Sequence, residues 1–339
     1  MNNSGIILVL AYPDTIVRTS EEWYSPYLRY MGMGTKNYIR AGHAALVLIE
    51  KPTGKLDYYD FGRYVTKLSY GRVRSKERDR ELDFPLKAIL RNGEIVNLDE
   101  LLHFLGNNPK LTHGEGKMVA SVCDQIDYEV ANEYIQHCLR QGSYNYAAFV
   151  KNASNCARFV TDTLIASVTN PKIKKRLKKS KRFTPSTVSN VVLASTTKNS
   201  YEVLGDNVQV FNSTSRKETV RCFLDRLKEH QPNLEGNIEP KKLSILSEDA
   251  QWLSGVGSGV WFEISVLPTQ PFCYRIRRIS PYGNVDVDGV FKVNDPRFDV
   301  DKPYQFVYDS NCSHCSILQD ETVYYFTFQY DYLLDERSK

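Results

Sequence analysis

The sequence predicts an α+β protein of two domains, in which a mixed first half precedes a β-rich second half. With 339 residues, the chain has the length of about two domains of roughly 100–200 residues each. Hydrophobic residues make up 42 % of the chain and charged residues 25 %. These are ordinary values for globular proteins, and they exclude disorder over most of the length. From about Leu243 onward, short aromatic β-runs dominate, as in a separate β domain.

The first half alternates apolar runs with segments of helical spacing. Apolar runs that end at turn residues predict strands, and two of them flank a hairpin-like turn at 52–55. Helices are expected where cap residues precede apolar positions three and four residues apart. The predicted strands are 5–12, 43–50 and 56–64, and the predicted helices are 20–31, 127–141, 155–166 and 219–230.

The second half predicts a β-rich accessory domain. Its expected strands are separated by turns such as 281–284, and they are 260–266, 272–279, 285–293, 304–308 and 323–330. We therefore expect a first domain over residues 1–170, a basic linker over 171–190 and the accessory domain over 191–339.

One short segment explains the sign of the net charge, which is formally +4. Eight basic residues and no acidic one lie from Lys172 to Arg182, and without them 36 basic residues face 40 acidic ones. A body with this mildly acidic balance excludes a nucleic-acid binder with basic faces throughout. We interpret the basic segment as a solvated connector, with a weak contact to an anionic surface as the alternative.

The cysteines and the N-terminus favour a reducing location. Seven cysteines is an odd number and most are widely spaced, which predicts free thiols rather than a disulfide framework. The first five residues carry no positive charge, the following apolar run is too short for a signal peptide, and no run of about 18 apolar residues predicts a transmembrane helix. A cytoplasmic location is the expectation from these features.

The pair Cys312 and Cys315 forms a C-x-x-C spacing with His314 inside it. A structural zinc site needs four ligands, and the sequence has no second C-x-x-C. A redox role requires a βαβ context, which this β-rich region lacks. We therefore predict no metal and no cofactor, and the alternative that this pair binds a metal stays open.

The sharpest chemical feature is Cys156, which lies where a predicted helix begins. Ser154 or Asn155 can cap that helix, and its free N–H groups and dipole favour the thiolate and can stabilise a developing oxyanion. A nucleophile needs a base, and His43 at the head of an apolar strand is the best candidate. Asp60, on the adjacent predicted strand, can orient the imidazole.

Each of these residues also has a structural interpretation. A free cysteine is more often a small buried hydrophobe than a nucleophile. His43 can be a core or edge residue with one satisfied hydrogen bond, and Asp60 can form an ion pair with Arg63 or another basic group. The residue types alone leave both interpretations open.

The order of these motifs resembles that of a known superfamily. A histidine opening an apolar strand, a polar residue on the next strand and a late Asn-Cys-x-x-Phe-Val helix start are similar to circularly permuted NlpC-type, papain-like hydrolases. Lecithin:retinol acyltransferase-like proteins share this order. The longer string of motifs, at 42–45, 59–64, 70–74 and 155–160, also resembles an uncharacterised bacterial family of this class. The resemblance covers roughly residues 5–168, and it implies His43 as base, Cys156 as nucleophile and Asp60 as orienting group.

One departure from that pattern bears on the chemistry. The acyltransferase branch usually has a second histidine where this chain has Asp60, which favours a peptidase or amidase-like triad. Arg72 and Arg74 alternate on one strand face and can bind a substrate carboxylate or phosphate, or form ion pairs with the acidic residues of 77–83. Together with Asn155, they are the predicted substrate-binding residues.

The sequence therefore predicts a cysteine hydrolase that cleaves an amide in a peptide or a peptidoglycan-like fragment. A lipid or thioester acyl hydrolase or acyltransferase of the same fold is the first alternative. A non-catalytic interaction protein that keeps the fold is the second. No specific nucleic-acid partner is expected.

Overall fold

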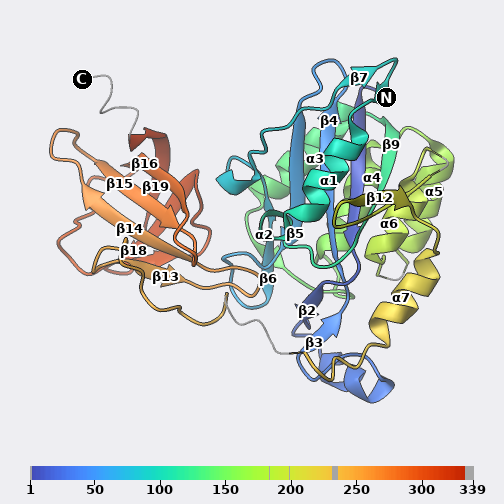
Figure 1. The fold of residues 1–339 in the computed structure, drawn as a ribbon. Coiled ribbons are helices and arrows are strands. Elements are labelled where there is room, and N and C mark those ends of the chain that lie inside the picture. Colours follow the sequence, from blue (N-terminus) through green and yellow to red (C-terminus); the bar gives the residue numbers. More distant parts are fainter. Residues whose placement is uncertain (1, 183, 198, 231–235, 333–339) are drawn as a thin grey trace. The chain divides into compact units, whose positions relative to one another are not determined.

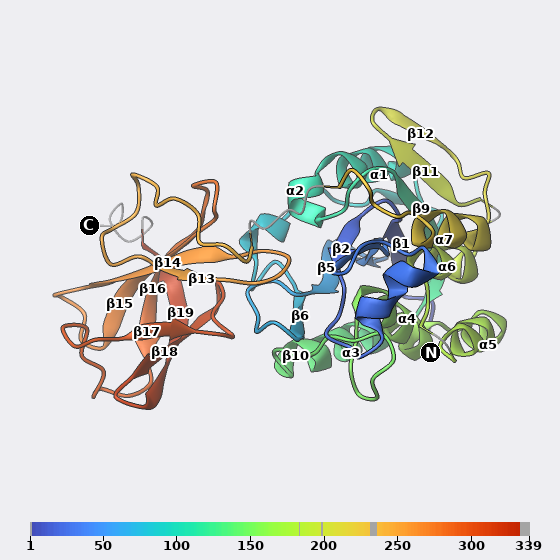
Figure 2. The ribbon, with the colours of Figure 1, turned by 90° about the horizontal axis from the view of Figure 1, so that it is seen from below.

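The computed structural model describes residues 2–182, 184–197, 199–230 and 236–332 (Figures 1 and 2). The chain divides into two compact units. The first is formed by Met1–Gly62, Gly71–Arg74 and Phe84–Pro232, and the second by Arg63–Tyr70, Ser75–Asp83 and Asn233–Lys339. Among the described residues, no helix combines the length and the apolar character needed to cross a membrane.

The first unit is built on an eight-stranded sheet with β1 near its centre. Along the sheet the strands are β10 (Tyr144–Asn145), β6 (Tyr70–Arg74), β5 (Leu56–Gly62), β4 (His43–Glu50), β1 (Gly5–Tyr12), β9 (Met118–Ile126), β11 (Tyr201–Leu204) and β12 (Asn207–Val210). All eight residues of β1 are buried, and β1 pairs antiparallel with both β4 and β9. A strand buried on both faces is a continuous apolar run, as its sequence GIILVLAY is.

Helices cover both faces of this sheet (Figure 2). One face carries α3 (Tyr128–Arg140), α4 (Cys156–Ser167), α5 (Pro171–Ser180) and α6 (Thr187–Ala194), and the other carries α1 (Leu98–Asn107) and α2 (Pro109–Thr112). Ala44 and Leu46 of β4 share one core cluster with Phe159 and Val160 of α4. Because successive side chains of a strand point to opposite faces, this cluster fixes which residues of β4 face α4.

Smaller elements complete the first unit. They are β2 (Ile16–Arg18), the 3₁₀ helix η1 (Ser25–Met31), β3 (Tyr38–Arg40), β7 (Leu90–Arg91), β8 (Glu94–Ile95) and α7 (Ser215–Phe223). The helix predicted over 20–31 is confirmed only from Ser25, as a 3₁₀ helix with proline in its first turn. Proline is tolerated there because the N–H groups of the first turn have no partner within the helix.

The second unit is a seven-stranded antiparallel sheet. Its order is β13 (Gln251–Leu253), β14 (Val260–Val266), β15 (Cys273–Ile279), β16 (Val285–Val293), β19 (Thr322–Asp331), β18 (His314–Gln319) and β17 (Gln305–Val307). The Gln251 side chain donates to the Tyr304 carbonyl at 3.1 Å and accepts from the Phe306 N–H at 2.8 Å. These bonds bring the two edge strands together, so the sheet is nearly closed into a barrel around an aromatic core. The predicted α+β class with a β-rich second domain is confirmed.

Two segments beside β6 belong to the second unit rather than the first. Val65 donates its N–H to the Ser258 carbonyl at 3.0 Å. The 3₁₀ helix η2 (Arg80–Leu82) follows Asp79, which is fully buried and forms an ion pair with the buried Arg278 at 3.2 Å. A buried charge needs such a partner, so this pair fixes the 75–83 segment to the β-rich unit.

The segment predicted as a basic linker is a packed helix in the structure. Asn170 caps α5 by accepting from the N–H groups of Lys172 and Ile173. Ile173 and Leu177, one turn apart, are buried in the core of the first unit. The boundaries predicted from sequence therefore differ from the observed division, because these two apolar residues hold the segment against the first unit.

Removal of the buried Leu177 side chain tests this packing. We expect Leu177→Ala to lower the free energy of unfolding by about 2–4 kcal/mol, since it leaves a cavity in the core. Lys178→Ala, next along α5 but exposed, is the matched control and should change it by less than about 0.5 kcal/mol. Urea unfolding followed by circular dichroism measures both. Equal small effects would contradict a packed α5.

Candidate functional site

His43 and Asp60 meet on neighbouring strands of the first sheet. Asp60 of β5 lies directly opposite Ala45 of β4, and Ala45 is two residues beyond His43, so the two side chains leave the same face of the sheet. The Nε2 atom of His43 donates to Oδ2 of Asp60 at 2.9 Å. His43 is 5 % exposed and Asp60 is fully buried.

Arg74 supplies the charge that keeps Asp60 ionised. It lies opposite Asp60 in the β5–β6 register and donates from Nε to Oδ1 at 2.9 Å and from Nη2 to Oδ2 at 2.6 Å. The Tyr58 hydroxyl adds a bond to Oδ2 at 3.2 Å. Burial alone would raise the pKa of Asp60, but the charge of Arg74 and the hydrogen bonds of His43 and Arg74 hold that pKa well below its usual range.

Cys156 is the first residue of α4, and its thiol interacts with the His43 ring. Burial alone would lower the pKa of His43. The hydrogen bonds and charges of Asp60 and Cys156 outweigh burial and raise that pKa to about 9. At neutral pH His43 is therefore an imidazolium between a carboxylate and a sulfur atom.

The position of His43 at the very start of β4 explains how its ring reaches both partners. Asp60 is on the sheet face opposite to α4, because Ala44 and Leu46 occupy the α4 face. Gly42, immediately before the strand, has φ +74, and a Cβ there would come within 3.0 Å of the Tyr12 carbonyl oxygen. Glycine tolerates this left-handed backbone conformation. The chain therefore turns immediately before β4, and His43 is the first residue of the strand.

The start of α4 leaves two backbone donors beside the sulfur. Asn155 caps the helix by accepting from the Arg158 N–H at 2.9 Å, and its carbonyl accepts from the Phe159 N–H. In the part of the chain that the structure describes, the N–H groups of Cys156 and Ala157 have no acceptor. Such unsatisfied donors at a helix N-terminus bind negative charge.

The other buried cysteines have a different electrostatic environment. Burial raises the pKa of Cys123 to about 12 and that of Cys312 to about 11, and it also raises the pKa of Cys138 and Cys222. Cys312 and Cys315 are buried in the second unit, where Arg278 donates to the Cys312 sulfur at 3.3 Å. Among the described residues, no group of three or more His, Cys, Asp or Glu side chains could hold a metal ion.

The residues predicted to bind substrate are Arg72, Arg74 and Asn155, and the structure shows the contacts that they make within the protein. Arg74 is 1 % exposed and forms an ion pair with Asp60. Arg72 is also buried. Asn155 caps α4, and its Nδ2 donates to the Ala147 carbonyl at 3.2 Å. The β5–β6 register places Arg74 opposite the buried carboxylate of Asp60, and a role of Arg72, Arg74 and Asn155 in substrate binding stays a prediction.

Two tyrosines that the sequence analysis did not single out surround the cluster. The Tyr12 ring stacks on the His43 ring at a centroid distance of 6.2 Å, and its hydroxyl donates to the Leu105 carbonyl. Tyr58 lies two residues before Asp60 on the same strand face and contacts its carboxylate. Tyr58 could have been predicted from its position two residues before Asp60 on a strand. Tyr12 could not, because its place beside His43 follows from the β1–β4 register.

Glu22 is a further residue that sequence analysis missed. Its carboxylate accepts from the N–H groups of Ala148 and Phe149 at 2.7 and 3.0 Å and from the hydroxyls of Ser20 and Tyr24. Burial opposes the ionised form, but these four hydrogen bonds lower the pKa of Glu22. Glu22 thereby holds the loop that precedes Cys156, over a sequence distance that no local motif could indicate.

Comparisons with known proteins match two separate segments of the chain. Residues 7–173 match a family model described as type VI secretion system effector TseH-like, and residues 250–329 match the DUF6695 C-terminal domain. The crystal structure of the type VI secretion system effector TseH aligns with 62 % of this chain and 99 % of that chain, at 17 % identity and a TM-score of 0.39. No curated protein sequence gives a significant match.

These matches correct two expectations from the sequence. The family named there, the permuted NlpC-type hydrolases with lecithin:retinol acyltransferase-like motif order, is wrong, because the model that matches is the TseH-like one. The cytoplasmic location is also contradicted, since that model describes effectors of a secretion system. The chain thus combines a segment similar to TseH-like type VI secretion system effectors with a segment similar to the DUF6695 C-terminal domain.

Proposed function

We propose that the first unit is a cysteine hydrolase in which Cys156 is the nucleophile, His43 the general base and acid, and Asp60 the group that positions His43. The observation that carries the proposal is the His43 ring, which bonds Asp60 through one nitrogen and interacts with Cys156 at the start of α4. Nucleophile, base and orienting carboxylate in this order are the arrangement that activates a thiol.

The proposed reaction starts from a thiolate and an imidazolium. The Cys156 thiolate attacks the substrate carbonyl carbon, and the N–H groups of Cys156 and Ala157 stabilise the oxyanion. His43 gives its proton to the leaving amine as the C–N bond breaks, which leaves a thioester on Cys156. His43 then takes a proton from water as the water oxygen attacks the thioester carbonyl carbon. The C–S bond breaks, the carboxylic acid product leaves, and the Cys156 thiolate and the His43 imidazolium are restored.

The substrate we propose is an amide in a peptide or a peptidoglycan-like fragment. Asp60 as the orienting residue supports a peptidase or amidase mechanism over acyl transfer. The match of residues 7–173 to TseH-like effectors supports a chain that acts after delivery by a type VI secretion system. The buried cluster provides the same chemistry for any of these amides.

Release of soluble fragments from peptidoglycan tests the proposed activity. We expect the full chain to release them and Cys156→Ala to reduce the rate by at least about 10³-fold, because the nucleophile is gone. Cys138→Ala, which removes another buried thiol of the same unit, is the matched control and should keep the rate. Fragments are measured by chromatography and mass spectrometry. Full activity in Cys156→Ala would refute the mechanism.

Alkylation of Cys156 as a function of pH tests its pairing with His43. Because the pKa of His43 is raised to about 9, the imidazolium is present from pH 6 to 8 and should keep alkylation by iodoacetamide fast there. In His43→Gln that cation is absent, so the rate at pH 7 should fall about tenfold or more and rise with pH like that of an ordinary thiol. Peptide mapping measures the rate at each cysteine. Identical pH profiles in both proteins would contradict the pairing.

Asp60→Asn tests two proposed roles of this carboxylate, as counterion of Arg74 and as orienting group for His43. It leaves the buried Arg74 charge without its counterion, so we expect the free energy of unfolding to fall by about 3–5 kcal/mol. Activity should also fall by up to about 10⁴-fold, because His43 loses its orienting acceptor.

The double variant Asp60→Asn with Arg74→Gln serves as the control for that experiment. Removing both charges should recover part of the lost stability while activity stays low. Urea unfolding and fragment release are compared in the same preparations. Recovery of activity in the double variant would show that Asp60 acts only through Arg74 and not on His43.

A further inference from the structure

The helix α5 has three distinct faces. At 3.6 residues per turn, Lys172, Lys175, Arg176 and Lys179 lie on one face because their spacings are three, four and seven residues. Ile173 and Leu177 form the buried face. Lys174 and Lys178 occupy the remaining side, about 150° and about 110° around the helix from the middle of the first face, and they do not line the hollow described next.

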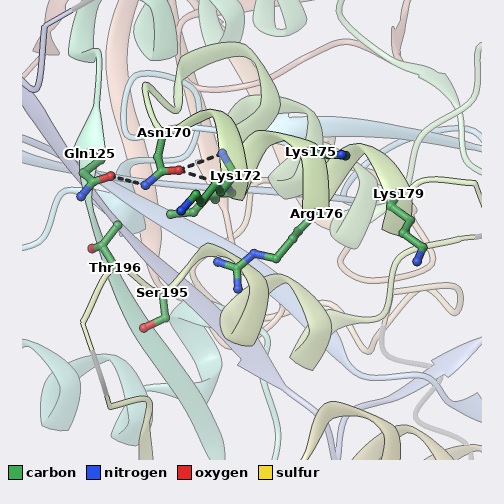
Figure 3. Close-up of a pocket in the computed structure, with 9 residues that line it drawn as sticks. Gln125, Asn170, Lys172, Lys175, Arg176, Lys179, Ser195 and Thr196 are labelled. Carbon is green, nitrogen blue, oxygen red and sulfur yellow. Dashed lines mark hydrogen bonds between the residues drawn. The ribbon is translucent and has the colours of Figure 1, made fainter.

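The four cations on the first face line a hollow of about 550 Å³. Figure 3 shows Gln125, Ser195 and Thr196 across from α5, with the Arg176 side chain extending toward the two hydroxyl residues. This wall is fixed, because Thr196 donates to the Val122 carbonyl at 3.0 Å and the Asn170 amide donates to Gln125 at 2.8 Å. The volume lies in the range of about 300–1,000 Å³ that is typical of small-molecule sites.

The cations of this hollow have no counterions of their own. In the described part of the chain, no hydrogen bond or ion pair is made by the side chains of Lys172, Lys175, Arg176 or Lys179. Lys181, further along the same segment, is the basic residue there with an ion pair, to Asp162. Four cations on one wall repel one another, so binding an anion relieves this repulsion.

We propose that this hollow binds a soluble ligand that carries several phosphate groups. The planar guanidinium of Arg176 suits bidentate contacts to phosphate oxygens, and the lysines add point charges. A lipid surface fits less well, because the apolar residues of α5 are buried in the core rather than exposed for insertion. The concave shape also favours a compact anion over a flat surface.

The hollow is distinct from the candidate catalytic site. Cys156 begins α4 and α5 follows shortly after the end of α4. The 12 residues of α4 span about 18 Å at 1.5 Å per residue. Ligand binding at α5 is therefore a separate property of the first unit, and its test does not depend on the hydrolase proposal.

Titration with inorganic tripolyphosphate tests the proposal on the full chain. We expect saturable binding by calorimetry that weakens as salt is raised. Lys172→Gln with Arg176→Gln should weaken it at least about tenfold. Lys174→Gln with Lys178→Gln removes the same charge at the same spacing from the other side of α5, so it is the matched control and should change the affinity less than about twofold. Circular dichroism confirms that both variants are folded.

Three results would overturn the proposal. Absence of saturable binding is the first, and an equal loss in the control variant is the second, because it would indicate a general charge effect. The third is sedimentation of the protein with phosphatidylglycerol vesicles, or binding of duplex DNA, that saturating tripolyphosphate does not displace. Those results would assign the cations to a lipid or nucleic-acid surface instead. Displacement of either by tripolyphosphate supports the hollow as the site.

Discussion

The buried ion pair of Asp60 and Arg74 is the interaction on which the candidate site depends. A carboxylate without a partner in this interior would take up a proton, because burial disfavours its charge. Arg74, from the next strand, makes two hydrogen bonds to it at 2.9 and 2.6 Å. The hydrogen bond and charge of the ionised Asp60 in turn help to raise the pKa of His43, which favours its imidazolium form.

Residue types and their order were enough to predict His43, Asp60 and Cys156 as a group, and the geometry brings them together as a proposed triad. The ion pair between Arg74 and Asp60 could not be predicted from residue types and their order. Asp60 and Arg74 face each other because of the β5–β6 register, and the connection between these strands includes Arg63–Tyr70, which belongs to the other unit. Register in a hairpin follows from its connection, so a connection built into a different unit leaves no local signal in the sequence.

The fold was predictable where apolar periodicity was strong. β1, β4, α3, β14 and β16 lie where the sequence predicts them. β9 was missed, although it is buried and pairs with β1, because Ser121, Asp124 and Gln125 interrupt its apolar run. α5 was taken for a connector because six of its ten residues are cations, whereas the two residues that decide its position, Ile173 and Leu177, are a minority. Burial of a few apolar side chains outweighs the average polarity of a segment.

The formal charge of +4 describes neither of the two charged sites. Buried charges must be paired, because removing them from water costs several kcal/mol each, and the buried ion pair of Asp60 with Arg74 and His43 meets this requirement. Exposed cations remain hydrated and need no counterion, so those of α5 can stand unpaired beside a hollow. The net charge sums buried paired charges and exposed unpaired cations, so it does not distinguish between them. Burial is what separates them: the paired, dehydrated charges can control proton transfer, and the unpaired, hydrated charges remain available to a ligand.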